Sequence, residues 1–259
     1  SASGQVQREN ITPGLPKLDS ARLPIHTFEL EIDSQSLHNR WDHVGSFRRA
    51  GRRGTEEAVV ALRHQVRPVE VKVVTRLDGT PVLARYLEIT NTGKVPAALG
   101  RVTPLSGALW HTNTGITECY ANTNPSFVEG KESKFSLGYL ASEGWGQEGG
   151  FKWQQLPKEN FRIERAQHGR SWGSPYYMLR NNATGESCFL GLAWSGNFEA
   201  EFSYKNDAML FFRLAPLAPA PLRVIAPGET VSSPEVHIAP FHCQFDQAVI
   251  LWHKHMRAS

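Results

Sequence analysis

Cysteine is scarce in this sequence, and its three copies lie far apart, at Cys119, Cys188 and Cys243. No C-x-x-C pair occurs, so neither a zinc ribbon nor a dithiol redox centre is indicated. An odd number also argues against a full disulfide framework, although a single bridge stays open. We expect these cysteines to serve mainly as small buried hydrophobic residues.

Long hydrophobic runs and a strong charge excess are also missing. No stretch approaches the roughly 18 consecutive apolar residues of a membrane-spanning helix, so no membrane contact is expected. The 28 basic and 25 acidic side chains leave a net charge of +3, which alone does not indicate a nucleic-acid partner. The densest basic cluster comprises Arg48, Arg49, Arg52 and Arg53. Two glutamates follow it closely, so a solvated turn or a charged strand edge is favoured over a phosphate contact.

Motifs of nucleotide binding and of nucleophilic catalysis are absent as well. No G-x-x-x-x-G-K-[ST] loop occurs. Ser195-Gly196 and Ser106-Gly107 come nearest to a G-x-S-x-G nucleophile turn, and both lack the full pattern.

The histidines show no spacing that selects an acid–base or metal-binding set. His253 and His255 are two residues apart in a predicted helix and therefore face different sides of it. His111, His168 and His237 are isolated in the sequence. We therefore expect no metal site and no cofactor.

The sequence does contain a series of short segments with strand-like alternation. Residues 26–32 alternate polar and apolar side chains, and 59–66 and 69–77 behave similarly. Asp78-Gly79 separates two such runs and predicts a hairpin. Further strands are expected at 100–109, 135–140, 161–165, 176–180, 188–194, 198–204, 209–214 and 236–238. Without any βαβ alternation, this pattern predicts an all-β fold built as a large antiparallel β-sandwich.

One helix is expected, at 245–257, where Phe245, Val249, Trp252 and Met256 form a single apolar stripe. The predicted organisation is an irregular leader over 1–24, a sandwich domain over 25–243 and a connector helix over 244–259. The first residues have neither the basic nor the apolar segment of a signal peptide, which favours a cytoplasmic location. A processed end would look the same.

Long stretches rich in glycine and aromatic residues interrupt the strands at 110–134, 141–160 and 166–175. Trp145 and Trp172 each stand among glycines and polar residues there. Tryptophan offers a flat apolar surface and an N–H donor, which suits the C–H face of a sugar ring. The alternative is that these tryptophans plug loops or fill an interface.

Several segments resemble, in the right order, the N-terminal domain of glycoside hydrolase family 36, the bacterial α-galactosidase family. The most specific is Gly191 to Glu201, with the run S-G-N-F-E-A-E. Others are Ala84 to Gly93, which ends in T-N-T-G, Gly169 to Pro175, and Leu222 to Pro234 around A-P-G-E-T. The resemblance extends over roughly residues 25–257, with the final helix matching the one that leads towards the catalytic barrel.

The resemblance implies a β-supersandwich similar to the galactose mutarotase fold, followed in the family by a TIM barrel. That barrel carries two aspartates for retaining hydrolysis of terminal α-galactosides, a reaction that needs two carboxyl groups about 5 Å apart. We expect this sequence to be either an excised domain or a family relative without the barrel, because its residues end before one would begin. Lys152-Trp153-Gln154 has Gln where the family's nucleophile motif has Asp. The resemblance therefore implies a non-catalytic domain that packs on a barrel and supports homo-oligomer formation.

The candidate sugar-binding residues that follow from the resemblance are Trp172, Trp145, Arg170 and Asn197. The implied ligand is an α-galactoside or a related carbohydrate. Two rival hypotheses remain, an independent carbohydrate-binding module using Trp145 and Trp172, and a small mutarotase-like enzyme acting on sugars.

Overall fold

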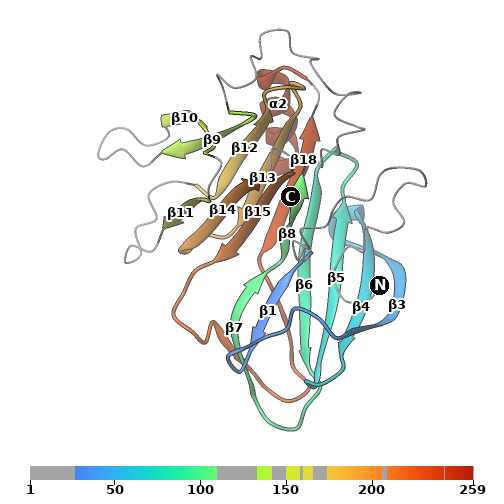
Figure 1. The fold of residues 1–259 in the computed structure, drawn as a ribbon. Coiled ribbons are helices and arrows are strands. Elements are labelled where there is room, and N and C mark those ends of the chain that lie inside the picture. Colours follow the sequence, from blue (N-terminus) through green and yellow to red (C-terminus); the bar gives the residue numbers. More distant parts are fainter. Residues whose placement is uncertain are drawn as a thin grey trace, which may run out of the picture.

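The computed structural model describes residues 27–109, 133–141, 150–157, 160–165, 174–205, 209–241 and 243–258. Within these ranges the chain forms antiparallel strands and a single α-helix, α2 (Phe245–Ala258), which confirms the predicted all-β fold with a C-terminal helix (Figure 1). The predicted leader, residues 1–24, lies outside the described residues. No helix in the described part is long and apolar enough to cross a membrane.

The described strands form one long sheet and two shorter ones. The long sheet has the order β10-β9-β12-β13-β18-β6-β5-β4-β3. The short strand β17 pairs with the C-terminal residues of β6, 88–90. Its strands are β3 (Trp41–Ala50), β4 (Glu56–His64), β5 (Val69–Leu77), β6 (Leu83–Asn91), β9 (Phe135–Ala141), β10 (Gly150–Gln155), β12 (Tyr176–Asn181), β13 (Ser187–Ala193), β17 (Thr230–Ser232) and β18 (Glu235–Phe241).

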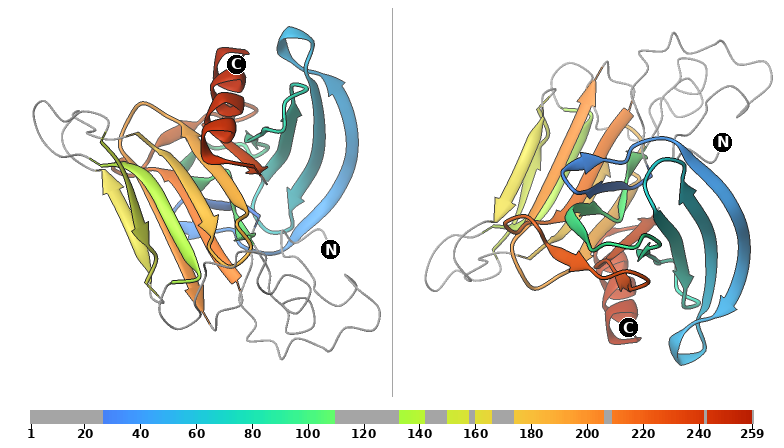
Figure 2. Two further views of the ribbon diagram at one scale, coloured as in Figure 1. Left: turned by 90° about the horizontal axis from the view of Figure 1, so that it is seen from above. Right: turned by 90° about the horizontal axis from the view of Figure 1, so that it is seen from below.

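The two shorter sheets have the orders β16-β7-β1-β2 and β11-β14-β15-β8. Their strands are β1 (Glu29–Ile32), β2 (Gln35–Ser36), β7 (Ala97–Thr103), β8 (Leu105–Leu109), β11 (Phe161–Arg165), β14 (Phe198–Lys205), β15 (Met209–Pro216) and β16 (Arg223–Ile225). Both sheets face the same side of the long sheet, whereas α2 lies on the opposite side (Figure 2).

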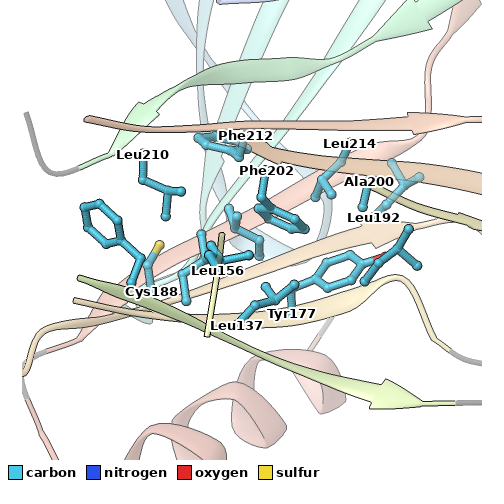
Figure 3. Close-up of a cluster of buried hydrophobic side chains, with 14 of the residues drawn as sticks. Leu137, Leu156, Tyr177, Cys188, Leu192, Ala200, Phe202, Leu210, Phe212 and Leu214 are labelled. Atoms are coloured by element: carbon cyan, nitrogen blue, oxygen red, sulfur yellow. The ribbon is translucent and has the colours of Figure 1, made fainter. Parts of the chain in front are cut away.

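Two apolar cores fill the space between the long sheet and the shorter ones. The first joins β9, β12 and β13 to β14 and β15, with Phe202, Tyr177 and Leu214 among its fully buried members (Figure 3). The second joins β4, β5 and β6 to β1 and β7. A third, smaller cluster lies between the long sheet and α2. The long sheet is therefore covered on both faces at its centre.

This double coverage explains the composition of β13. Six of its seven residues are buried, because Phe189 packs on the helix side while Cys188 and Leu190 enter the first core. A strand buried on both faces has a continuous apolar sequence rather than an alternating one. The expectation of a buried cysteine is confirmed for Cys188, and burial raises the pKa of its thiol to about 12.

Arginine–glutamate contacts tie the two shorter sheets together. The Arg213 guanidinium on β15 donates to Glu199 and Glu201 on β14, at 2.7 and 3.4 Å, and to Glu29 on β1, at 2.9 Å. Glu199 is almost fully buried and also accepts a hydrogen bond from Arg162 on β11. A buried carboxylate held by two cations fixes the relative position of these strands.

The predicted hairpin at Asp78-Gly79 is confirmed, with residues 78–82 connecting β5 to β6 in antiparallel register. Gly79 has φ +81°, a conformation that glycine adopts without steric cost. The Asp78 carboxylate accepts hydrogen bonds from the Thr80 amide, at 2.9 Å, and from the Thr80 hydroxyl, at 2.5 Å. An aspartate that bonds the backbone two residues on is a common device for closing such a turn.

The observed strands differ from the predicted ones in several places. The edge strand β3 was not predicted, because most of its side chains are exposed and its sequence shows no alternation. Part of the expected loop at 141–160 is the strand β10. The single strand expected at 100–109 is two strands, β7 and β8, which belong to different sheets and meet at Pro104. Proline lacks an N–H and cannot continue a ladder, so the chain changes sheet there.

The basic cluster sits at the charged strand edge that was expected. Arg48 and Arg49 lie on β3 at the edge of the long sheet, and Arg52 and Arg53 lie in the tight turn that leads into β4. Arg49 is ion-paired with Glu57 and Glu88, at 2.6 Å each.

Candidate functional site

Of the four predicted sugar-binding residues, the structure describes only Asn197. Trp145, Arg170 and Trp172 lie outside the described residues, so whether the four meet remains a prediction. Asn197 is half-buried in the connection between β13 and β14. Its backbone carbonyl accepts hydrogen bonds from the Trp194 indole N–H, at 2.9 Å, and from the Leu217 amide, at 2.8 Å.

The S-G-N segment is a compact turn stabilised by its own tryptophan. The Trp194 indole folds back over Gly196, where an added Cβ would lie 2.8 Å from the indole nitrogen. Any larger residue at this position would require the indole to shift. The described geometry thus gives the most family-like segment a local structural role.

Two other family-like segments meet each other in the fold. In T-N-T-G, the backbone N–H of Asn91 donates to the backbone carbonyl of Glu229 at 3.1 Å. The backbone carbonyl of Asn91 accepts from the backbone N–H of Gly228 at 2.8 Å. The Asn91 side chain also donates to the Ile225 carbonyl at 3.0 Å. The T-N-T-G and A-P-G-E-T segments therefore form one structural joint, in which Asn91 satisfies backbone groups of both.

The best-defined candidate site is the junction between α2 and the long sheet. Trp252 lies nearly parallel to Phe189, with ring centroids 5.1 Å apart, and edge-to-face with Tyr176 at 5.7 Å. Gly191 on β13 makes this packing possible, because an added Cβ would lie 2.4 Å from the Tyr176 ring and 3.1 Å from Trp252. The apolar stripe predicted for the helix is confirmed in part: Trp252 docks and Phe245 and Val249 pack beside it, but Met256 is exposed. The most buried residues of the docked face are Ala248, Trp252 and His255.

A buried chain of hydrogen bonds crosses this junction. The Asp78 carboxylate and His255 Nδ1 are 2.5 Å apart, and His255 Nε2 lies 2.6 Å from His237 Nδ1. His237 Nε2 lies 3.4 Å from a carboxylate oxygen of Glu235, which accepts two hydrogen bonds from Arg76. The exposed fractions are only 1% for His255 and 3% for His237. We call these five residues the histidine junction.

The contact between these two histidines was not predicted from the sequence. His237 is isolated from other histidines in the sequence and lies on β18 next to the buried Val236. His255 lies three residues after Trp252 on the same side of α2, which is the one available clue, because such positions share a helix face. The contact spans 177 residues between Asp78 and His255 and arises only from the tertiary fold.

The electrostatics of the histidine junction favour anionic carboxylates and a neutral His255. Burial opposes ionisation of Asp78, but hydrogen bonds from Thr80 and His255 outweigh it and lower the pKa of that carboxyl. Burial likewise opposes ionisation of Glu235, yet His237 and Arg76 lower its pKa to about 2. For His255, burial lowers the pKa more than the Asp78 carboxylate raises it.

Such a junction is poorly suited to catalysis on a sugar. A general acid or base must come within hydrogen-bond reach of its substrate, and both imidazoles are covered by protein. Glu235 is held as an ionised carboxylate by Arg76 and so cannot serve as a proton donor near neutral pH. Among the described residues, no group of three or more histidines, cysteines and acidic residues is arranged to hold a metal ion.

An exposed aromatic surface lies beside the first turn of α2. Phe151 and Trp153 project from the same side of the edge strand β10, with exposed fractions of 40% and 42%. Phe245 of α2 contacts both rings, at centroid distances of 5.4 and 5.9 Å, and the Arg180 guanidinium lies 5.8 Å from the Trp153 ring centre. Gly138 leaves space for Phe151, since an added Cβ would lie 2.4 Å from that ring. We call these four side chains, Phe151, Trp153, Arg180 and Phe245, the aromatic surface.

The chain matches no model of a known protein family and no curated protein. Its fold is similar to solved structures of GH36 α-galactosidases. For AgaA of Geobacillus stearothermophilus the TM-score is 0.64 at 15% sequence identity, and the match covers 88% of this chain and 31% of that one. For the α-galactosidase of Lactobacillus brevis the TM-score is 0.62 at 14% identity, and the match covers 88% of this chain and 30% of that one. For the galactosidase domain of the α-galactosidase–sucrose kinase AgaSK the TM-score is 0.62 at 14% identity, and the match covers 83% of this chain and 30% of that one.

At this level of identity the likeness establishes the fold alone. The chain spans less than a third of the length of these neighbours, so its fold matches one part of those structures.

Proposed function

We propose that this chain is a non-catalytic β-sandwich domain of an α-galactosidase-like glycoside hydrolase, and that it packs on a barrel which carries the catalytic carboxylates. The observation that carries the proposal is the extent of the fold match, 88% of this chain against 31% of AgaA. The ordered family-like segments support it independently, because they were identified from the residues alone.

The chemistry of the buried carboxylates supports a structural role. A retaining glycosidase needs one carboxyl group as proton donor and a second as nucleophile. Here the buried Glu57 and Glu199 and the partly exposed Glu235 each accept hydrogen bonds from an arginine. Hydrogen bonds from arginine hold these carboxylates in fixed positions, which suits a scaffold.

The experiment that tests this proposal is to read the coding sequence around this chain and to assay its complete product. We expect a downstream βα-barrel with paired aspartates, and hydrolysis of p-nitrophenyl α-galactoside by the complete protein. Aspartate-to-asparagine variants in that barrel should abolish the hydrolysis. A complete protein without a barrel, or with a barrel inactive on galactosides, would remove the proposal.

The finer roles of such a domain, oligomer contact and shaping of the sugar site, are part of the same proposal. Trp172 and Trp145 are the loop aromatics we assign to the rim of that site, together with Arg170 and Asn197. In the complete protein, Trp172→Ala should raise KM for an α-galactoside more than it lowers the melting temperature. Unchanged kinetics would take Trp172 out of the site.

A second candidate function, direct carbohydrate binding by this domain, is favoured by the aromatic surface. Exposed Phe151 and Trp153 offer apolar rings held in place by neighbours, and the Arg180 guanidinium offers hydrogen-bond donors beside them. Ring faces combined with polar donors suit a pyranose. AgaA has been solved in complex with stachyose, an observation that concerns that enzyme.

Calorimetric titration of this chain with raffinose separates the two candidates. Heat that disappears in Trp153→Ala, and persists in the control Trp194→Ala, supports binding at the aromatic surface. Trp194 is a suitable control because it is an exposed tryptophan on a different part of the fold. Absence of heat in the unmodified chain leaves the scaffold role alone.

A further inference from the structure

The outer strand β3 has one side without a neighbouring strand. It is the longest described strand, with ten residues, and it lies at the margin of the molecule (Figure 1). Among the described strands it pairs only with β4, so the backbone N–H and C=O groups along its other side have no strand partner in that part of the chain. Such an edge is a template for pairing with another strand.

The devices that commonly protect an edge are few along most of β3. The strand contains no proline and no lysine. Its one irregularity, a bulge at Val44, lies in the first half, and the register with β4 is regular from Gly45 to Ala50. Val44 and Phe47 have exposed fractions of 53% and 47%. The second half of β3 is therefore a regular, open edge that carries an exposed aromatic ring.

The two arginines of this segment do not guard the outer edge, because both are bound on the inner side. Arg48 donates to Glu56 on β4 at 3.1 Å. Arg49 donates to Glu57 on β4 and to Glu88 on β6, at 2.6 Å each. Both guanidinium groups therefore lie beside carboxylates of the inner strands, which balance their charge.

The occupant that fits this edge is a second copy of the same strand. A strand that pairs with its own copy across a two-fold axis runs antiparallel to it. Because hydrogen-bonded and non-bonded residue pairs alternate along such a ladder, the axis must place one residue opposite its own copy. An axis at Ser46 would bring the bulged Val44 into the ladder, and an axis at Arg48 would oppose like charges. An axis at Phe47 avoids both.

We propose that β3 joins two copies of this chain into a dimer with one continuous sheet, and that the two Phe47 rings face each other at the axis. Aromatic residues directly opposite on neighbouring strands stabilise a sheet. Gly45 then lies opposite Arg49 of the other copy, and the space beside Gly45 is open, since an added Cβ would meet no atom within 4 Å. The same register carries the exposed Asp42 towards the exposed Arg52 of the other copy, so opposite charges approach at both ends of the contact.

This inference names a surface for the oligomer contact of the proposed function. It concerns the chain itself, and it stands whether or not the complete protein has a barrel or hydrolyses galactosides. Its failure is therefore distinguishable from failure of the proposed function.

Sedimentation velocity of the purified chain tests the pairing. A contact of one strand on each side is small and should dissociate in the micromolar range, so the mass should rise from one chain to two between about 1 and 100 µM. Phe47→Arg and Phe47→Asp should each weaken self-association by at least about tenfold, because like charges would face each other across the axis.

An equimolar mixture of these two variants is the sharpest test. It should associate again, because an arginine of one copy then faces an aspartate of the other. The matched control is Val66→Arg, which changes another exposed apolar residue, with an exposed fraction of 62%, in the connection between β4 and β5. That variant should associate like the wild type.

Three results would overturn the pairing: a wild-type chain that stays monomeric at about 100 µM, Phe47→Arg that associates like the wild type, and a mixture that stays monomeric. If a charged variant does not fold, Phe47→Cys decides instead. Residues directly opposite in an antiparallel pair have Cα atoms about 4.5–5.5 Å apart, within the reach of a disulfide. Mild oxidation should therefore give a dimer cross-linked at position 47, identified by peptide mass mapping, and oxidised protein without that link would refute the proposal.

Discussion

Gly191→Ala is the substitution that tests the packing of α2 most sharply. An added Cβ at this position of β13 would lie 2.4 Å from Cδ1 and 2.6 Å from Cε1 of Tyr176, and 3.1 Å from Trp252. Carbon atoms in ordinary contact are about 3.5–4.0 Å apart, so the methyl group and the ring cannot both keep their places. Tyr176 packs edge-to-face on Trp252, with ring centroids 5.7 Å apart, so the added methyl group would push its ring against the helix.

The expected cost follows from this overlap. Overpacking by one methyl group in a well-filled site typically costs about 1–3 kcal/mol. For a protein of this size, each kcal/mol lowers the melting temperature by about 2–4 °C. We therefore expect Gly191→Ala to melt about 2–12 °C below the wild type.

The assay is thermal unfolding followed by circular dichroism, with Gly107→Ala as the matched control. Gly107 also lies in a strand, and an added Cβ there would meet no atom within 4 Å. That variant should melt at or slightly above the wild-type temperature, because alanine restricts the unfolded chain. Equal melting temperatures for Gly191→Ala and the wild type would refute the described packing of Tyr176 and Trp252.

Three further predictions concern charges and the first core. Glu235→Gln should reduce the difference in unfolding free energy between pH 7 and pH 3 by about 1 kcal/mol, measured by urea titration. The reason is that the lowered pKa of the Glu235 carboxyl contributes stability above about pH 4.5, and this contribution is lost as pH falls towards 2. An unchanged difference would contradict the ion pair with Arg76. Arg213→Leu should cost about 2–4 kcal/mol of unfolding free energy, because it removes one of the two arginines that hold the buried Glu199 and also the bond to Glu29. Arg48→Leu, which removes an exposed pair, should cost less than about 0.5 kcal/mol. Equal costs for the two variants would refute the account. Phe202→Ala should cost about 3–5 kcal/mol because its ring is fully buried, and a loss below about 1 kcal/mol would contradict the core of Figure 3.

The architecture was largely predictable because burial on one face leaves a pattern in the sequence. β5 and β6 alternate buried and partly exposed residues, and Asp78-Gly79 marks the turn between them. The helix was predictable because its docking residues repeat at helical spacing. β3 escaped prediction because an exposed edge strand has little reason to alternate.

The sites were much less predictable than the fold. Asp78, His237 and His255 come from separate elements, and no local spacing records that they share one buried chain of hydrogen bonds. Trp153 was assigned to a loop, whereas its ring projects from an edge strand beside Phe151 and Phe245. The partners of a side chain in a β-sandwich are set by sheet order and layer packing, which local sequence does not encode.

The most direct test of the central claim is an α-galactosidase assay of the purified 259-residue chain with p-nitrophenyl α-galactoside. A domain that supports a catalytic barrel, with its buried carboxylates held by arginines, should release no nitrophenol above the uncatalysed rate. Sustained turnover by this chain, removed by substituting one of its own carboxylates, would contradict the account.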